Sequence, residues 1–267
     1  FISEWKYMII IISPAKTLNF ETPPITREYT QPAFLDDSAK LISGLKKLEP
    51  EQISQLMSIS PKLGILNSNR YYAWNRPFTL KNSKQAMLAF KGDVYTGLDA
   101  GTMTTAELAF AQDHLRILSG LYGILHPLDL IQPYRLEMGT QFKNSRGKNL
   151  YEFWGDRITQ TLNLDLKKQK DSILINLASN EYFQSIHTQN LEARIITPVF
   201  KDEKNGVYKI ISFFAKKARG MMSRYIIRNE LTNPEAIKKF NVAGYQFDAR
   251  SSNQDEWVFI RAESKAA

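Results

Sequence analysis

The stretch DHLRILSGLYGILHPLDLIQPYRLEM, residues 113–138, decides how we read the rest of this sequence. Leu115 and Leu118 begin an apolar pattern with three- and four-residue spacings, which predicts a helix over the first half of the stretch. Gly120 and Gly123 then interrupt that pattern. Two glycines this close allow a tight turn and leave backbone N–H groups free to bind an anion. We therefore expect an anion-binding turn here, between a helix and a second apolar segment that lies between Pro127 and Pro133.

The composition supports a basic, globular protein. The chain has 267 residues, 35 Lys and Arg against 27 Asp and Glu, a net charge of +8 and 43% hydrophobic residues. Such a charge favours nucleic acid, other polyanions or anionic membrane surfaces as partners, although many proteins carry solvated lysines that bind nothing. No apolar run approaches the roughly 18 residues of a membrane span, so we expect a soluble protein. The absence of cysteine excludes disulfides and thiolate metal sites, and it suits a reducing cytoplasm.

The order of the predicted elements indicates a single mixed α/β domain over residues 8–267. Residues 1–7 precede a natural start at Met8, and we interpret them as an extension or tag. Strand and helix patterns interleave along the chain, without repeats or long linkers. This order predicts a central mixed sheet with helices around it.

Six segments have the composition of strands. Residues 8–12 and 172–177 are short apolar runs, which is typical of fully buried strands. Residues 195–200 and 207–214 are separated by a loop that ends in Asn-Gly, the strongest short hairpin signal. Residues 245–248 and 257–260 suggest a last hairpin.

Two polar loops, each of which follows an apolar segment, contain candidate site residues. Ser13 and Lys16 follow the first predicted strand, where side chains commonly face a crevice. The loop at residues 91–97 brings a lysine, Asp93 and Tyr95 within five positions. Ser13 and Lys16 also match the S-x-x-K spacing of penicillin-binding serine enzymes, but the S-D-N and K-T-G elements of those enzymes are missing.

The second concentration of charge lies late in the chain. Residues 209–228 contain six basic residues and no acidic one, and a helix is predicted over 216–231. On that helix, Lys217, Gly220, Arg224 and Arg228 recur at intervals of three or four. Gly220 is explained equally well by close approach of a phosphate and by tight packing against another helix.

The acidic residues beside loops leave catalysis open. Asp93, Asp129, Glu137 and Glu181 lie at turns, where a general acid or base could act, but most such carboxylates are helix caps or ion-pair partners. The three histidines are widely spaced and show no paired-ligand pattern, so we expect no metal. Neither a Walker loop nor G-x-G-x-x-G is present, and we expect no cofactor.

The sequence closely resembles the YaaA family of bacterial peroxide-stress proteins from Met8 to about Phe259. The segments that carry the resemblance are ISPAKTL at 12–18, AFKGDVYTGL at 89–98, LRILSGLYGILHPLDLIQPYRLEMG at 115–139, INLASNEYF at 175–183 and PVFKDEKNGVYKIISFFAKKARGMMSRYII at 198–227.

This resemblance implies a cytoplasmic protein that protects cells against hydrogen peroxide by keeping intracellular free iron low. It also implies DNA binding, a single-domain α/β fold, a positively charged cleft and a helix–hairpin–helix element. The matching hairpin here would surround Ser119–Gly123. Its glycines are separated by two residues, whereas such motifs usually have one.

We therefore expect a monomeric protein that binds duplex or branched DNA through phosphates, with little sequence specificity. The expected contact residues are Lys16, Arg116, Ser119, Gly120, Gly123, Arg135, Lys216, Lys217, Arg219 and Arg224. The alternative is an enzyme acting on a nucleotide or damaged base, in which Lys16, Asp93, Tyr95 and Glu181 meet in one enclosed cavity and Asp93 or Glu181 is the acid or base. A third option is a protein-interaction module in stress signalling.

Overall fold

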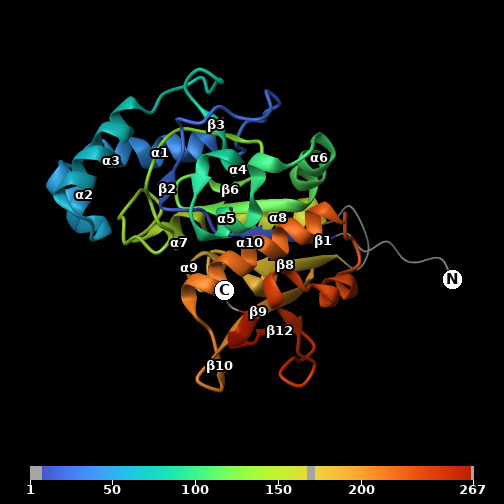
Figure 1. Cartoon of the computed structure of the whole chain (residues 1–267). Helices are drawn as coiled ribbons and strands as arrows, with labels where there is room; N and C mark the ends of the chain where they lie inside the picture. The colour runs from blue at the N-terminus through green and yellow to red at the C-terminus, as the bar shows by residue number, and fades with distance from the viewer. Residues whose placement is uncertain (1–7, 167–171, 266–267) are drawn as a thin grey trace.

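The computed structural model of the chain describes residues 8–166 and 172–265. The expected extension at residues 1–7 lies outside them. The fold is mixed α/β, with one central mixed sheet and helices packed around it, as predicted (Figure 1). Within the described residues, no helix is both long and apolar enough to cross a membrane.

The main sheet has the strand order β11-β12-β9-β8-β1-β5-β6, and β10 pairs with β9 beside this path. Neighbours from β12 to β5 run parallel, whereas the β5–β6, β9–β10 and β11–β12 pairs are antiparallel. The strands are β1 (Met8–Ile12), β5 (Leu115–Ser119), β6 (Gly123–Leu125), β8 (Ile173–Leu177), β9 (Arg194–Lys204), β10 (Val207–Lys209), β11 (Gln246–Phe247) and β12 (Glu256–Arg261). Two small pairs lie apart from it: β2 (Thr17–Leu18) with β4 (Phe90–Lys91), and β3 (Lys84–Gln85) with β7 (Leu130–Ile131).

The central strand is β1, and its position follows from its composition. All five of its residues are fully buried, because neighbouring strands flank it on both sides and helices cover it. The chain reaches β5 on one side of β1 and later returns to β8 on the other side. The direction of strand addition therefore reverses at β1, which creates a crevice beyond its carboxyl end.

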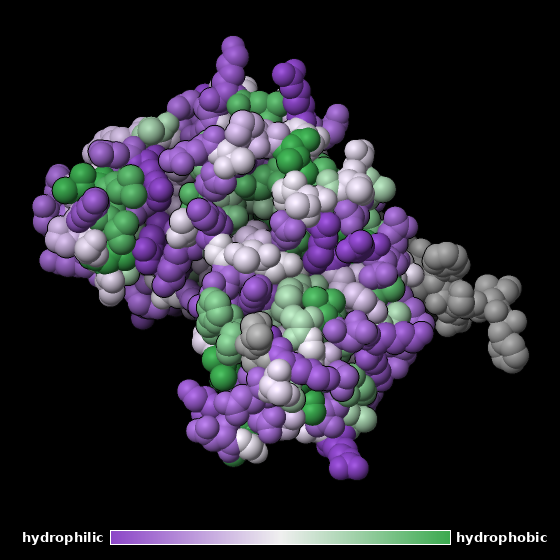
Figure 2. Space-filling view, in the orientation of Figure 1, coloured by the Kyte–Doolittle hydropathy of each residue, from purple (hydrophilic) through white to green (hydrophobic). Residues whose placement is uncertain are grey.

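The helices surround this sheet. They are α1 (Leu35–Leu45), α2 (Pro50–Met57), α3 (Pro61–Ala73), α4 (Ala86–Ala89), α5 (Asp93–Leu98), α6 (Thr105–His114), α7 (Leu150–Trp154), α8 (Arg157–Leu166), α9 (Asn180–Phe183) and α10 (Ser212–Arg228). Short 3-10 turns lie at Ala100–Thr102, Thr188–Asn190, Pro234–Lys239, Val242–Gly244 and Glu263–Lys265. In Figure 1, α10 crosses the front of the sheet, and α2 and α3 project from one side. Figure 2 shows mainly hydrophilic side chains on this face, with small hydrophobic areas between them.

The helix predicted over the first half of residues 113–138 is wrong. Helix α6 ends at His114, and Leu115 begins β5, which pairs with β1. Every residue of β5 is buried. A fully buried strand has apolar side chains on both faces, so its hydrophobic pattern does not distinguish it from a buried helix.

The expected helix–hairpin–helix element is also corrected by this result. Gly120 lies in the turn between strands β5 and β6, and Gly123, at φ 73°, is the first residue of β6. An added Cβ at Gly120 would lie 2.2 Å from the backbone oxygen of Leu136, so this glycine is required for close packing.

The late hairpins are confirmed with shifted boundaries. Asn205 and Gly206 both have positive φ and join β9 to β10. The second strand ends at Lys209, and α10 already begins at Ser212, four residues before the predicted start. The last hairpin, β11 with β12, is also present.

Candidate functional site

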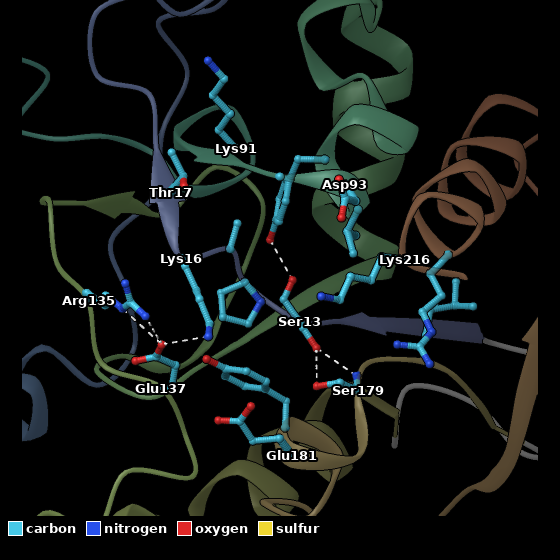
Figure 3. A pocket seen from close by; sticks show the side chains of 18 of the residues that line it. Ser13, Lys16, Thr17, Lys91, Asp93, Arg135, Glu137, Ser179, Glu181 and Lys216 are labelled. Carbon is cyan, nitrogen blue, oxygen red and sulfur yellow. Dashed lines mark hydrogen bonds and ion pairs between the residues drawn. The ribbon is translucent and has the colours of Figure 1, made fainter. Parts of the chain in front are cut away.

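The main cavity lies where the crevice was expected, beyond the carboxyl ends of β1 and β8. These parallel strands are in register, with Ile12 opposite Leu177. Ser13 and Ser179 follow them and contact each other: the Ser179 backbone N–H donates to Ser13 Oγ at 2.9 Å, and the two hydroxyls are 3.2 Å apart (Figure 3). The prediction that Ser13 and Lys16 face a crevice is confirmed.

The cavity has a volume of about 400 Å³, within the range of small-molecule sites. Its walls come from the loop after β1, the start of α5, residues 134–137, the start of α9 and the first turns of α10. Five basic and three acidic residues line it: Lys16, Lys91, Arg135, Lys216 and Arg219, with Asp93, Glu137 and Glu181.

The basic residues fall into two groups. Lys16 and Arg135 share one carboxylate, since Lys16 Nζ lies 3.4 Å and Arg135 Nη2 lies 2.9 Å from Glu137 Oε1. Lys91, Lys216 and Arg219, in contrast, form no ion pair with any residue that the structure describes. In Figure 3, Lys216 points toward Ser13, whereas Lys91 points away from it. The uncompensated charge therefore lies on the α10 side of the cavity.

Burial affects the titratable groups of the cavity walls. It lowers the pKa of Arg219 from its usual value, yet an arginine guanidinium stays protonated at neutral pH. Burial also raises the pKa of Tyr95 and Tyr182 well above that of free tyrosine. Both phenols therefore remain neutral, and Tyr95 donates its hydroxyl to the Ser13 carbonyl oxygen at 3.0 Å. These tyrosines can bind a ligand by hydrogen bonds but are unsuited to act as bases.

The acidic residues are held at different places on the wall. Glu181, at the start of α9, accepts the Gly139 backbone N–H at 3.0 Å. Asp93 lies in the first turn of α5. The four residues of the catalytic alternative, Lys16, Asp93, Tyr95 and Glu181, thus line the same cavity. Asp129 is instead buried and structural, because it accepts hydrogen bonds from Thr30 and from the His126 backbone.

The turn around the two glycines lies away from this cavity and within the core. Arg116 is 1% exposed, and its guanidinium is satisfied by Asp165 and by two backbone carbonyls. Ser119 is fully buried and bonds to Tyr134, and the Gly120 carbonyl accepts the indole N–H of Trp154. Gly123 packs against that same indole ring. All four residues are buried, so we leave them out of the binding site.

Only some of the basic residues of α10 that we expected to contact DNA line the cavity. Lys216 and Arg219 line the cavity, and Lys217 is exposed outside it. Arg224 donates to the Asp99 and Thr102 carbonyls and lies 3.5 Å from Glu107, which satisfies its guanidinium. For Gly220, packing is the explanation, since an added Cβ would lie 1.8 Å from the Val94 carbonyl oxygen.

The sequence interpretation missed several wall residues: Ser179, Glu137 in its pairing role, Tyr134 and Tyr182. Ser179 could have been found, because it follows the second predicted buried strand as Ser13 follows the first. The tyrosines carried no such signal, since an isolated aromatic residue is more often part of the core. Among residues 8–166 and 172–265, no group of three or more His, Asp or Glu side chains is arranged to hold a metal ion.

Comparison with known proteins places the chain in a family. Residues 8–251 match the family described as peroxide stress protein YaaA. The chain is 60% identical over 256 residues to a UPF0246 protein of Cellvibrio japonicus, covering 96% of this chain and 99% of the relative. It is 59% identical over 256 residues to a UPF0246 protein of Teredinibacter turnerae, covering 96% and 100%. The protein therefore belongs to the YaaA family of peroxide stress proteins.

Proposed function

We propose that this protein acts in peroxide stress by binding DNA through phosphate contacts at the basic cavity, with little dependence on base sequence. The observation that carries the proposal is that Lys216 and Arg219, both on α10, line one cavity without a carboxylate partner among the described residues. Unpaired cations beside a concave surface attract a polyanion, and phosphate contacts position DNA without reading its sequence.

The proposed site differs from the one expected from sequence. Glu137 partly neutralises the charges of Lys16 and Arg135, and Arg116 forms an ion pair with Asp165. The first turns of α10 therefore supply the main contacts, with Lys217 beside them. The partner is duplex or branched DNA, the protein acts as a monomer in the cytoplasm, and the low intracellular free iron that the family resemblance implies follows from DNA binding.

Binding should be measured by fluorescence anisotropy on duplex, single-stranded and branched DNA over a salt series. Affinity should fall steeply with salt, and each lost phosphate contact should reduce the slope of log affinity against log salt by about 0.9 on duplex. Lys216→Gln and Arg219→Gln should each lower affinity several-fold for every sequence. Lys62→Gln, an exposed lysine on α3, is the matched control. Affinity that does not change with salt would contradict the proposal.

The connection to iron needs a cellular measurement. Cells that carry the double variant Lys216→Gln/Arg219→Gln should show more chelatable iron under peroxide than cells with the wild-type protein or with Lys62→Gln. Equal iron in all three strains would separate DNA binding from iron limitation.

A second candidate function is favoured by one observation. Lys16, Asp93, Tyr95 and Glu181 line the same cavity, and its volume of about 400 Å³ is large enough for a nucleotide. In that alternative Glu181 or Asp93 transfers a proton at a nucleotide or damaged base. Incubation with DNA carrying oxidised bases and with free nucleotides should then give a product that Glu181→Gln or Asp93→Asn abolishes while DNA affinity is retained. No product from any of these substrates would reject this candidate.

A further inference from the structure

Arg219 is a partly buried cation without a partner. It lines the cavity from α10, and burial lowers the pKa of its guanidinium. Its carbonyl oxygen accepts a hydrogen bond from Ser223 at 3.0 Å, but its guanidinium forms neither a hydrogen bond nor an ion pair with any residue that the structure describes. Removing a charge from water is costly unless an opposite charge or hydrogen bonds replace the water. An anion bound in the cavity would supply that partner.

Lys216 completes a pair of cations on this wall. It precedes Arg219 by three positions on α10, and residues at that spacing are neighbours on a helix surface. Lys216 also has no ion pair among the described residues. A phosphate monoester carries about 1.5 to 2 negative charges at neutral pH, whereas each phosphate within a DNA strand carries one. The pair therefore matches a monoester better than an internal phosphate.

The serine pair at the strand ends adds a hydrogen-bond donor beside these cations. Lys216 points toward Ser13 (Figure 3). Ser13 Oγ donates to Ser179 Oγ at 3.2 Å and accepts the Ser179 backbone N–H. The Ser179 hydroxyl thus accepts one bond, while its own proton has no acceptor among the residues that the structure describes. A phosphate oxygen in the cavity would accept that proton.

The size of the cavity limits what can enter it. Its volume of about 400 Å³ suits a molecule of nucleotide size. A duplex, with paired nucleotides on two strands, can lie across the opening but cannot enter as a whole. A single nucleotide at the end of a strand can do so.

The wall away from α10 suits the nucleoside part of such a ligand. Glu181 accepts the Gly139 backbone N–H through Oε1, and its Oε2 forms no hydrogen bond with any described residue. In Figure 3, Glu181 and Lys216 lie on opposite sides of Ser13. A carboxylate accepts hydrogen bonds from the O–H and N–H groups that a sugar or base presents. An inorganic anion would satisfy only the cationic wall, whereas a nucleotide would satisfy both.

We propose that the cavity binds the phosphate monoester of a nucleoside, with its phosphate at Lys216, Arg219 and Ser179 and its nucleoside toward Glu181. The phosphorylated end of a DNA strand and a free mononucleotide both present this chemistry. The inference rests on the proposed DNA binding and deepens it. The phosphate that enters the cavity is a terminal one, and internal phosphates contact the exposed surface of α10 around Lys217.

The test compares internally labelled duplexes of one sequence whose ends carry a 5′-phosphate, a 3′-phosphate or hydroxyl groups only. The wild type should bind at least one phosphorylated duplex about tenfold more tightly than the hydroxyl duplex, because the added charge meets Arg219 and Lys216. Arg219→Gln should reduce that ratio to less than about twofold. Lys217→Gln removes an exposed charge outside the cavity and is the matched control. It should weaken binding to all the duplexes alike and keep the wild-type ratio.

A calorimetric arm separates the two sources of the monoester. Deoxyadenosine 5′-monophosphate, deoxyadenosine and inorganic phosphate are each titrated into the wild type and into Arg219→Gln. The monophosphate should bind the wild type about tenfold more tightly than either of the others, because only it meets both walls, and Arg219→Gln should remove this advantage. Binding of the monophosphate without any preference among the duplexes would support the monoester site and assign it to the free mononucleotide.

Other results overturn the inference. Equal affinity for all the duplexes together with no binding of the monophosphate would do so, as would a preference that Arg219→Gln leaves unchanged, or inorganic phosphate that binds as tightly as the monophosphate. If the wild type shows neither preference while Arg219→Gln weakens binding to every duplex, this inference fails and the proposed function stands. If the wild type binds the monophosphate but no DNA, the proposed function fails and the monoester site stands. If it binds none of the ligands, both fail.

Discussion

At the scale of the residue, the environment of an arginine decides its role. Arg116 and Arg219 both belong to the basic set that the sequence suggested for DNA binding. The Arg116 guanidinium is buried and donates to Asp165 and to two backbone carbonyls, whereas that of Arg219 lines the cavity with no ion pair among the described residues. A buried and paired guanidinium stabilises the fold, and an unpaired one at a cavity wall is available to an anion.

Arg116→Met is expected to destabilise the protein without altering DNA affinity. The variant leaves Asp165 without its partner and removes the bonds to the carbonyls of Gln112 and Leu115. Loss of one member of a buried pair costs about 3 kcal/mol or more in free energy of unfolding. Urea unfolding measures the loss, and anisotropy below the transition measures binding. A variant of unchanged stability that bound DNA more weakly would return Arg116 to the binding site.

At the scale of the element, the contact between α5 and α10 positions the cationic wall of the cavity. The two helices approach so closely that each has a glycine at the crossing. A Cβ at Gly97 would lie 2.2 Å from the Lys217 carbonyl oxygen, and one at Gly220 would lie 1.8 Å from that of Val94. This contact fixes the positions of Lys216 and Arg219 relative to Asp93, because Asp93 lies on α5 and the two basic residues lie on α10.

Gly220→Ala should therefore destabilise the protein, although alanine favours an isolated helix by about 1 kcal/mol. The backbone oxygen of Val94 cannot move aside as a side chain would, so the helices must separate. We expect a net loss of at least about 2 kcal/mol in free energy of unfolding. Gly101→Ala is the control, since an added Cβ there meets no atom within 4 Å. Equal stability of the two variants, measured by urea unfolding, would show that the contact is looser than described.

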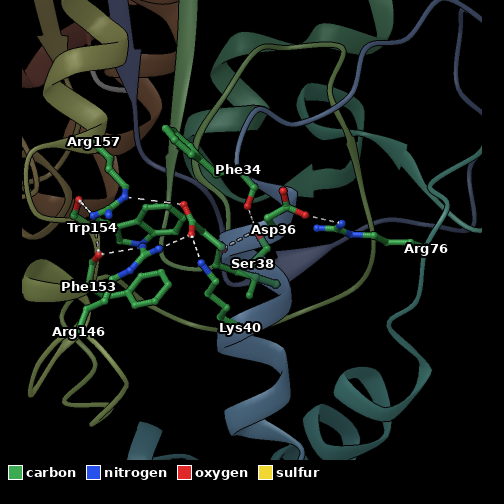
Figure 4. A network of polar contacts seen from close by, with 11 residues as sticks. Phe34, Asp36, Ser38, Lys40, Arg76, Arg146, Phe153, Trp154 and Arg157 are labelled. Carbon is green, nitrogen blue, oxygen red and sulfur yellow. Dashed lines mark hydrogen bonds and ion pairs between the residues drawn. The ribbon is translucent and has the colours of Figure 1, made fainter.

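At the scale of the whole molecule, a polar network around Asp37 connects three distant parts of the chain (Figure 4). Asp37, on α1, accepts hydrogen bonds from Arg146 and Lys40 and lies 3.8 Å from Arg157 Nε on α8. Burial alone would raise the pKa of Asp37, but the hydrogen bonds and charges of Arg146 and Lys40 outweigh it and leave the pKa below its usual value.

This shift predicts a defined pH dependence. A carboxyl whose pKa is lower in the folded protein stabilises it above the unfolded pKa, and the stabilisation is lost as pH falls through the folded value. Asp37→Asn should lower the melting temperature at pH 7 by at least about 3 °C, or roughly 1 kcal/mol in a chain of this size. The difference from wild type should stay constant down to about pH 5 and shrink below about pH 4. A difference that grew on acidification would contradict the assignment.

Much of the fold followed from local patterns. The buried strands β1 and β8 and the Asn-Gly hairpin were all predicted, because each depends on residues close together in the chain. The strand β5 was not, since a strand buried on both faces carries no alternating pattern. The candidate site was predicted only in part. Residues at strand ends were recognised from local patterns, but their contact partners lie in distant segments of the chain and were not recognised.

The sequence by itself determined the mixed α/β class, the excess of positive charge, the family resemblance and the crevice beyond the first strand. Only the tertiary structure decided which cations remain unpaired, because Asp165, Glu137 and Glu107 approach their partners through folding. The tertiary structure also showed that the glycine-containing stretch at 113–138, which we expected to contact phosphate, belongs to the core. Its strand β5 lies between β1 and β6, and all five residues of β5 are buried. Composition records how many charges a chain has, and packing decides which of them stay available to a ligand.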